Sequence, residues 1–272
     1  MRAVTVRDGQ VVVAEHPDPR PGTGEVLVRV HAAGLNGADL HQRAGRYPAP
    51  PGAPADIPGL ELAGEVAETG PGAARFDVGD RVMAVVGGGG QAELAVVHER
   101  AALPVPDELD WDAAGGFPEV FTTAHDALFT ELHEAVAGLG ARPISPEGFA
   151  EHGPFDVVLE LVGGPNLPDD LRSLATGGRI TVIGVGGGPR AEVDLLALMG
   201  AQGRIHGSTL RPRPLEGKAL AARRVERQVL PLVRRGDVRV PVAATFPLDE
   251  VADAYERFAA GGKLGKIVLR CA

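Results

Sequence analysis

Residues 155–162 of this chain have the sequence FDVVLELV, and residues 178–185 have the sequence GRITVIGV. Both runs are largely apolar and rich in β-branched side chains, as expected of strands that are buried on both faces. A helix is predicted between them at residues 167–175, and a second helix (193–201) and a third strand (204–210) follow. Because apolar strands that alternate with helices indicate a parallel sheet covered on both faces, this part of the chain is predicted to be α/β.

The first third of the chain has a different pattern. Short β-branched runs are separated there by Pro, Gly and Asp, which is typical of a small, partly open β-barrel. One short helix is expected at residues 38–44, with Asn36 or Asp39 as its cap. The predicted strands of this region are residues 1–6, 11–14, 25–33, 64–69 and 81–86.

Helical periodicity begins at Pro118, from which apolar side chains recur at intervals of three and four residues as far as Leu139. One helix is therefore predicted over residues 118–139, with Gly140 as its C-cap. A long amphipathic helix is predicted over residues 214–235. The tail is then expected to form a strand, a helix and a strand, at residues 240–246, 248–260 and 266–269.

Composition restricts the class of protein. A hydrophobic content of 44% and a charged content of 23% are typical of a soluble globular chain. The net charge is −9 and no basic stretch is present, so nucleic acid is not expected as a partner. The opening residues do not resemble a signal peptide, and the apolar runs are far shorter than a membrane span, so a cytoplasmic location without membrane association is expected.

The sequence offers little to a metal ion or to a nucleophilic triad. Cys271 is the only cysteine, which leaves no disulfide within the chain and no cysteine-built zinc site. The 8 histidines are scattered, and none is paired at a ligand spacing. No Ser-His-Asp or Cys-His arrangement is indicated. We therefore expect no metal.

Three blocks of the sequence carry a resemblance to a known family. The first is residues 35–47 (LNGADLHQRAGRY), and the second begins at residues 59–66 (GLELAGEV) and continues through GDRV and GGGQAE. The third is the ending, from FPLDEVADA at residues 246–254 to GKIVL at residues 265–269. Together they resemble the zinc-independent quinone oxidoreductases of the medium-chain dehydrogenase/reductase superfamily, and in particular the subgroup typified by the p53-inducible quinone oxidoreductase.

This resemblance implies a fold and an activity. The fold would be a GroES-like, partly open β-barrel domain (residues 1–117 and 241–272) with a truncated Rossmann-like parallel sheet domain (residues 118–240). The activity would be transfer of hydride from NADPH to a quinone or another electron-poor acceptor, a small molecule. Such proteins commonly form homodimers by pairing their last strand, here residues 204–210.

The resemblance also implies roles for matching residues. Tyr47 and Asn36 would line the nicotinamide and acceptor pocket and are the candidate catalytic residues. Candidate cofactor-binding residues are Thr123 at the nicotinamide end, Gly184, Val185, Leu210 and Arg211 on the carboxamide side, and Lys266 near the phosphate or ribose. Simpler roles are also open: Asn36 as a helix cap, Thr123 as a packed helix residue, and Lys266 as a solvated charge at a strand edge.

The family carries a further strand, glycine-rich turn and helix where this chain joins Thr130 to Glu131. That unit holds the pyrophosphate of the cofactor, so its loss removes the main hydrogen-bond donors. The glycines at residues 184–188 are not expected to replace it, because Pro-Arg-Ala-Glu follows them instead of a helix. The glycines at residues 163–164 end in a proline turn, and those at residues 87–90 are expected to form a hairpin or bulge with close backbone approach.

The gap leads to further expectations. The strand at residues 155–162 would become a sheet edge, covered by the helix at residues 118–139 or by a partner chain. Residues 141–144 would form an orphaned third strand. Two functions stay open: an NADPH-dependent quinone reductase, and a cofactor-independent binding protein or non-redox enzyme, such as a cyclase or isomerase, on the same scaffold.

Overall fold

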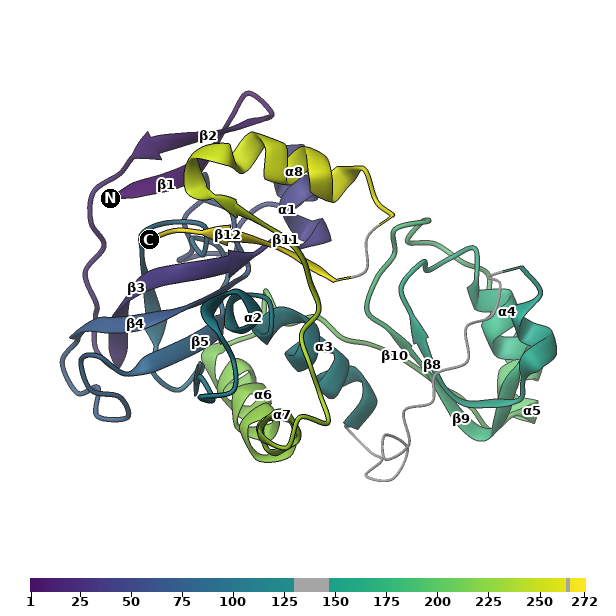
Figure 1. The fold of residues 1–272 in the computed structure, drawn as a ribbon. Coiled ribbons are helices and arrows are strands. Elements are labelled where there is room, and N and C mark those ends of the chain that lie inside the picture. The colour runs from purple at the N-terminus through teal and green to yellow at the C-terminus, as the bar shows by residue number, and fades with distance from the viewer. Residues whose placement is uncertain (130–146, 263–264) are drawn as a thin grey trace. The chain divides into compact units, whose positions relative to one another are not determined.

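The computed structural model of the chain describes residues 1–129, 147–262 and 265–272. The chain forms two compact units, one made of Met1–Thr122 with Leu210–Ala272 and the other of Thr123–Thr209 (Figure 1). The end of the predicted helix 118–139 and the predicted strand 141–144 lie outside the described residues. The boundaries of these units differ from the predicted domain boundaries, and the domain assignment stays a prediction.

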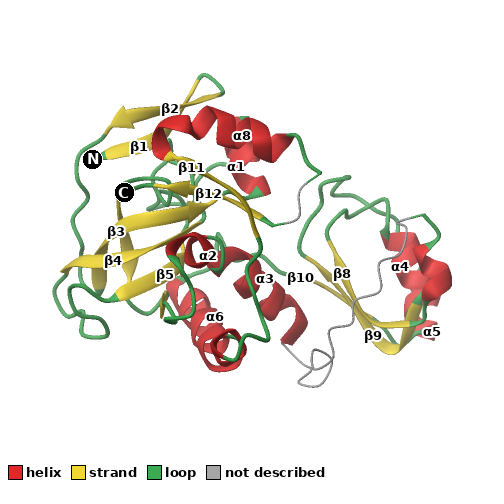
Figure 2. Cartoon of the chain, in the orientation of Figure 1, coloured by secondary structure: helices red, strands yellow, loops and turns green. Residues whose placement is uncertain are grey.

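The first unit is built on a seven-stranded sheet, drawn among the yellow strands of Figure 2. Strand β3 (Glu25–Gly34) lies at its centre and pairs antiparallel with β4, β6 and β12. The expected strands of the barrel and tail are confirmed, and β6 and β7 are additional. The other strands of the sheet are β4 (Glu61–Thr69), β5 (Arg81–Val85), β6 (Leu94–His98), β7 (Ala102–Pro104), β11 (Val242–Pro247) and β12 (Lys266–Arg270).

Outside the sheet, β1 (Arg2–Arg7) and β2 (Gln10–Glu15) form a separate antiparallel hairpin, as the two opening β-branched runs predict. The helices of the unit include the expected α1 (Gly37–Arg43) and α8 (Val251–Ala259), which follows the short turn η2 (Leu248–Glu250). A short helix, α2 (Trp111–Gly115), is additional, and the described part of α3 is Pro118–Phe129.

The prediction of one long helix at residues 214–235 is wrong, because the segment forms two helices. Helix α6 (Leu215–Gln228) ends at Gln228, and α7 (Leu230–Arg234) begins after the shared cap residue Val229. Pro231 stands in the first turn of α7, where a proline is tolerated. In one continuous helix it would lie in the interior, where its missing N–H would remove a hydrogen bond and its ring would clash with the preceding turn. Apolar periodicity alone carries no sign of this break.

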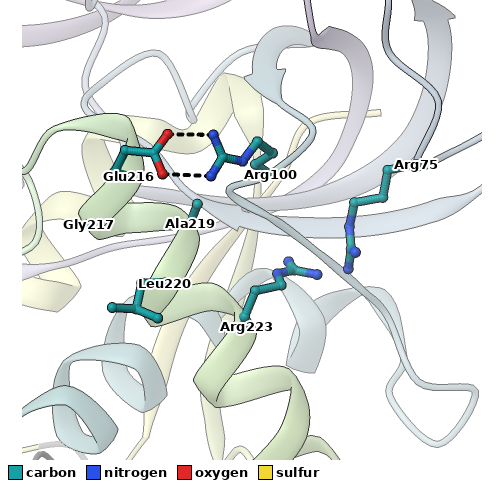
Figure 3. Close-up of a pocket in the computed structure, with 7 residues that line it drawn as sticks. All are labelled: Arg75, Arg100, Glu216, Gly217, Ala219, Leu220 and Arg223. Atoms are coloured by element: carbon teal, nitrogen blue, oxygen red, sulfur yellow. Dashed lines mark hydrogen bonds and ion pairs between the residues drawn. The ribbon is translucent and has the colours of Figure 1, made fainter.

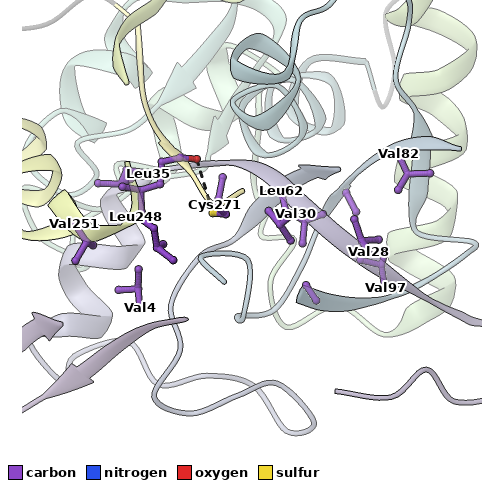
Figure 4. Packing of buried hydrophobic residues seen from close by; sticks show 14 of the residues in the cluster. Val4, Val28, Val30, Leu35, Leu62, Val82, Val97, Leu248, Val251 and Cys271 are labelled. Atoms are coloured by element: carbon purple, nitrogen blue, oxygen red, sulfur yellow. Dashed lines mark hydrogen bonds between the residues drawn. The ribbon is translucent and has the colours of Figure 1, made fainter. Parts of the chain in front are cut away.

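The core of the first unit is aliphatic, as the aromatic content of 4% requires. On one side of the sheet, Val28, Val30 and Leu62 pack with Leu248 and other residues of the tail (Figure 4). A second cluster joins the sheet to α6 and α7 through Met83, Leu103, Phe117, Val225, Leu230 and Val233. Burial of this kind stabilises the fold by about 1.5–3 kcal/mol for each large side chain. These contacts explain why residues 210–240 belong to the first unit.

Glycines permit a close backbone approach next to the candidate site. Gly88 and Gly89 have φ values of 158° and 82°, and a Cβ atom at Gly59 would lie 2.5 Å from the backbone nitrogen of Gln91. The loop at residues 87–90 therefore packs tightly on the segment that leads into β4. The predicted close approach of this loop is confirmed.

The second unit contains a three-stranded parallel sheet in the order β10-β9-β8. Its strands are β8 (Phe155–Glu160), β9 (Leu174–Val182) and β10 (Arg204–Gly207), and its helical segments are η1 (Phe149–His152), α4 (Leu167–Arg172) and α5 (Leu195–Gly200). Leu171, Leu174 and Ile180 form its small core. Among the described strands β8 is an edge, as predicted, and the cover proposed for it stays a prediction. The α/β assignment and the barrel-plus-parallel-sheet fold class are confirmed.

Candidate functional site

Arg211 and Tyr47 form a stacked pair in the first unit. The guanidinium carbon of Arg211 lies 4.5 Å from the centre of the Tyr47 ring. The Nε of Arg211 donates to the Gly87 carbonyl at 2.8 Å, its Nη1 to the Tyr47 carbonyl at 3.2 Å, and its Nη2 to the Gln42 Oε1 at 2.6 Å. The arginine is 5% exposed and thereby joins helix α1, the loop after it and the loop after β5.

All these acceptors are neutral. In the described part of the chain, no carboxylate lies within ion-pair distance of Arg211. A buried guanidinium is therefore held by carbonyl groups and one aromatic face, and its positive charge is not offset locally. The Tyr47 hydroxyl forms no hydrogen bond with any described residue and is free to meet a ligand. The cluster can present a phenol, an aromatic edge and a positive field to a flat, electron-poor ring.

Asn36 lies at the N-cap of α1 and forms a capping box with Asp39. Its Nδ2 also donates to Glu61 Oε1 at 3.0 Å, and its Oδ1 accepts from Lys266 Nζ at 2.8 Å. The capping role falls in part to Asp39, whose carboxylate accepts the Asn36 backbone N–H at 2.8 Å. The cap interpretation of Asn36 agrees with its position, and its side chain additionally contacts Glu61 and Lys266.

Lys266 is 11% exposed at its side chain and forms an ion pair with Glu61, with Nζ and Oε1 2.6 Å apart. Its ammonium group also donates to the Leu35 carbonyl at 3.0 Å and to Asn36. Three acceptors therefore take its three N–H groups, which leaves no donor for a phosphate or ribose in this arrangement. The alternative of a solvated strand-edge charge is wrong because the side chain is buried.

Glu61 is fully buried, and both oxygens of its carboxylate accept hydrogen bonds. Its Oε2 accepts the Glu119 backbone N–H at 2.9 Å, while its Oε1 accepts from Lys266 and Asn36. Gly34 makes room for it, since a Cβ atom there would lie 2.3 Å from Oε1. The family block at residues 59–66 contains this glutamate, but the sequence alone did not distinguish it from a surface residue.

A second buried chain of polar groups runs from Asp39 to Tyr255. The Gly59 backbone N–H and Gln91 Nε2 donate to the Asp39 carboxylate at 3.2 and 3.3 Å, and the Tyr255 hydroxyl donates to Gln91 Oε1 at 2.9 Å. Burial raises the pKa of Asp39 to about 6, although its backbone hydrogen bonds and Lys266 oppose the shift. Burial also raises the pKa of Tyr255 well above its usual value. This network fixes helix α1, which carries Gln42, against the barrel.

The remaining candidate residues are divided between the two units. Leu210 is buried in the first unit next to Arg211, whereas Thr123, Gly184 and Val185 belong to the second. Gly184 follows β9 and donates its N–H to the Glu160 carbonyl at 3.2 Å, and Val185 is 48% exposed. The structure therefore brings Tyr47 into contact with Arg211, and Asn36 into contact with Lys266.

In the second unit, carboxylates bind N–H groups of the loop before α4 and of the N-terminus of α5. In the loop between β8 and α4, the Glu160 carboxylate accepts the Val162 backbone N–H, the Gly163 N–H at 2.5 Å and the Asn166 side-chain amide at 3.3 Å. At α5, Asp194 accepts the Leu196 and Ala197 N–H groups at 2.9 and 3.1 Å. A pyrophosphate needs such N–H groups unpaired and no negative charge beside them.

Glycines allow the loop after β8 to pack closely against the loop after β9. Gly164 N–H donates to the Gly188 carbonyl at 2.9 Å, and Gly187 N–H to the Val162 carbonyl at 2.8 Å. A Cβ atom at Gly164 would lie 2.2 Å from the Arg190 carbonyl oxygen. The glycines therefore serve the packing of loop on loop. Within the described ranges, no helix that follows a parallel strand fits a dinucleotide pyrophosphate.

A hollow of about 470 Å³ lies beside α6 in the first unit, apart from Tyr47 and Arg211 (Figure 3). Three arginines line it, and each is paired: Arg100 with Glu216, and both Arg75 and Arg223 with Glu226. The Arg100–Glu216 contact is bidentate, at 2.5 and 2.7 Å. The pairs of Arg75 and Arg100 connect α6 to loops of the barrel, and we assign the hollow a structural role.

A zinc site does not fit the described residues. They contain no group of three His, Cys, Asp or Glu side chains placed to hold a metal ion. Cys271 is buried, and burial raises the pKa of its thiol to about 12, so it is a poor source of the thiolate that zinc prefers.

The described helices include none long and apolar enough to cross a membrane.

Two family models match separate parts of the chain. Residues 22–107 match the alcohol dehydrogenase GroES-like domain family, and residues 144–269 match the zinc-binding dehydrogenase family. The chain is 28% identical to the quinone oxidoreductase of Rattus norvegicus, over 99% of this chain and 97% of that protein. It is 29% identical to the quinone oxidoreductase of Pseudomonas aeruginosa, over 94% of each. The first of these alignments spans 329 positions, more than the chain's 272 residues, so the rat protein carries residues that this chain lacks.

Solved structures show the same relationship. An alcohol dehydrogenase superfamily protein from Novosphingobium aromaticivorans superposes with a TM-score of 0.85, at 25% identity and over 100% of both chains. A GroES-like barrel, a parallel sheet and these relatives together define the class. The chain belongs to the quinone oxidoreductase-like family of the medium-chain dehydrogenase/reductase superfamily, and its relatives support an oxidoreductase function in general.

Proposed function

We propose that this protein binds quinone-like, electron-poor ring compounds at Tyr47 and Arg211 and reduces them with hydride from weakly bound NAD(P)H. The observation that carries the proposal is the Arg211 cluster. It holds the Tyr47 loop against α1 and β5 through three hydrogen bonds and leaves the phenol hydroxyl free. The relatives named quinone oxidoreductase, which match almost the whole chain, support the substrate class.

The chemistry assigned to the chain's own residues concerns the acceptor. Tyr47 can stack against a flat ring or donate its hydroxyl to a quinone oxygen, and Arg211 places positive charge near the oxygen that becomes negative on reduction. Asn36 is held by Glu61 and Lys266, so we assign it a positioning role at the edge of this region. When bound, a nicotinamide supplies the hydride.

A second candidate function is favoured by the helix N-termini of the second unit. Glu160 and Asp194 occupy the N–H groups that a pyrophosphate would use, which supports a protein that binds ring compounds without a nicotinamide. Such a protein could be a binding protein or a non-redox enzyme of the cyclase or isomerase type. In either case we propose a cytoplasmic homodimer without a metal, which pairs through the last strand, β10.

Two measurements on the purified chain distinguish the candidates. The first is the loss of NADPH absorbance with menadione at millimolar NADPH, and the second is menadione binding followed through the fluorescence of Trp111. Turnover that Tyr47→Phe and Arg211→Met reduce supports the reductase. Binding without turnover supports the second candidate. If menadione neither binds nor is reduced, both proposals are wrong.

A further inference from the structure

A small cavity near Arg211 contains a buried hydroxyl without a partner. The cavity lies between β5, β7, α3 and α6 in the first unit, and its lining includes Thr122, Leu210 and Lys218. Thr122 is 4% exposed, and its Oγ1 forms no hydrogen bond with any described residue. Buried polar groups in folded proteins almost always have a partner, so a hydroxyl left without one indicates a group that arrives from outside the chain.

Lys218 contributes a second unpaired group to the same cavity. Its ammonium is half-buried and forms no ion pair in the described part of the chain. Burial lowers the pKa of Lys218, the positive charge of Arg211 lowers it further, and Glu119 opposes both. Arg211 and Lys218 are two cations of the same unit that repel each other in this region.

The position of Lys218 within α6 strengthens the point. It stands in the first turn after the N-cap, Pro214, where the partial positive charge of the helix end disfavours a cation. The end of the helix therefore does not account for this lysine. A negatively charged group at the cavity would satisfy Lys218, Arg211 and the end of the helix together.

We propose that Lys218, Arg211 and the Thr122 hydroxyl form a subsite for an oxyanion substituent, a sulfonate, carboxylate or phosphate, carried by the ring compound. This inference rests on the proposed function, since it places the ring at Tyr47, which Arg211 contacts. The cavity is about 10 Å³, enough for roughly one water molecule. The oxyanion therefore lies at its mouth, beside Lys218, with Thr122 reached through that water. The preferred acceptors are acidic quinones rather than neutral ones.

The test compares anthraquinone sulfonate with the neutral hydroxymethyl anthraquinone, by calorimetry on the whole chain without cofactor. We expect the wild-type protein to bind the sulfonate about tenfold more tightly, or better, and Lys218→Met to remove that advantage while leaving the neutral compound unchanged. Lys218→Arg should restore it. The matched control is Arg227→Met, which removes an exposed charge from the other end of the same helix.

Equal binding of the two compounds, or a sulfonate preference that survives in Lys218→Met, overturns the proposal. If neither ring compound binds, the proposed function fails, and inorganic sulfate then tests the subsite alone. Thermal stabilisation by sulfate that is lost in Lys218→Met and kept in Arg227→Met supports the oxyanion subsite. Stabilisation that is the same in all three proteins, or absent from the wild type, overturns it.

Discussion

The buried Glu61–Lys266 pair gives the sharpest prediction about the candidate site. Replacement of Lys266 with Met keeps the length of the side chain but removes the ammonium group from a carboxylate that is fully buried. Glu61 would keep only the Asn36 amide and the Glu119 backbone N–H. An unpaired buried charge costs about 3–5 kcal/mol, so the free energy of unfolding should fall by about that amount.

The assay is urea unfolding followed through Trp111, which lies in the same unit. The double variant Glu61→Gln with Lys266→Met should lose less stability than Lys266→Met alone, because removal of both charges leaves none unpaired. A loss below about 1 kcal/mol in Lys266→Met, as expected of an exposed pair, would refute the reasoning.

Three further predictions concern the surrounding network. Tyr255→Phe should lower the free energy of unfolding in urea by about 1–3 kcal/mol, because it leaves the buried Gln91 Oε1 unpaired. Tyr47→Phe should lower it by almost nothing. Equal losses would contradict the buried hydrogen bond of Tyr255. Since the folded pKa of Asp39 is raised from 3.8 to about 6, its contribution is fully present below the lower value and lost as the pH rises through the upper one. The stability of the wild type relative to Asp39→Asn should therefore change by about 3 kcal/mol over that window, and a flat difference would contradict the assignment. Gly34→Ala should lower the free energy of unfolding by about 1–3 kcal/mol, because its Cβ atom would lie 2.3 Å from Glu61 Oε1. Gly37→Ala is the control, because the space around Gly37 is open. Similar stability of the two variants would show that Glu61 can move aside.

The sequence predicted elements well where one physical signal dominates. Apolar runs gave β8 and β9, and the separation of strand-rich and helix-alternating segments gave the two parts of the fold. The break between α6 and α7 was missed because apolar periodicity continues through Pro231. Short strands such as β7, with three residues, carry too little periodicity to be recognised.

The candidate site was only partly predictable, and the reason is physical. Tyr47 and Arg211 came from resemblance, and the structure places them in contact. The partners of Lys266 could not be predicted, because Glu61 and Asn36 lie more than 200 residues away along the chain and only strand pairing brings them together. Glu61 itself stands in a strand whose neighbours are buried on both faces, a setting in which a charged residue signals a buried pair.

Our central proposal is that this chain retains the acceptor side of a quinone oxidoreductase-like site, and that its described helix N-termini leave no N–H groups free to hold the cofactor's pyrophosphate. Equilibrium titration of the purified chain with NADPH, followed by nicotinamide fluorescence, tests it most directly. Loss of several charge-assisted hydrogen bonds predicts a Kd in the millimolar range or weaker. Saturable binding in the micromolar range would contradict the claim, because it would require a pyrophosphate site that the described helix N-termini do not provide.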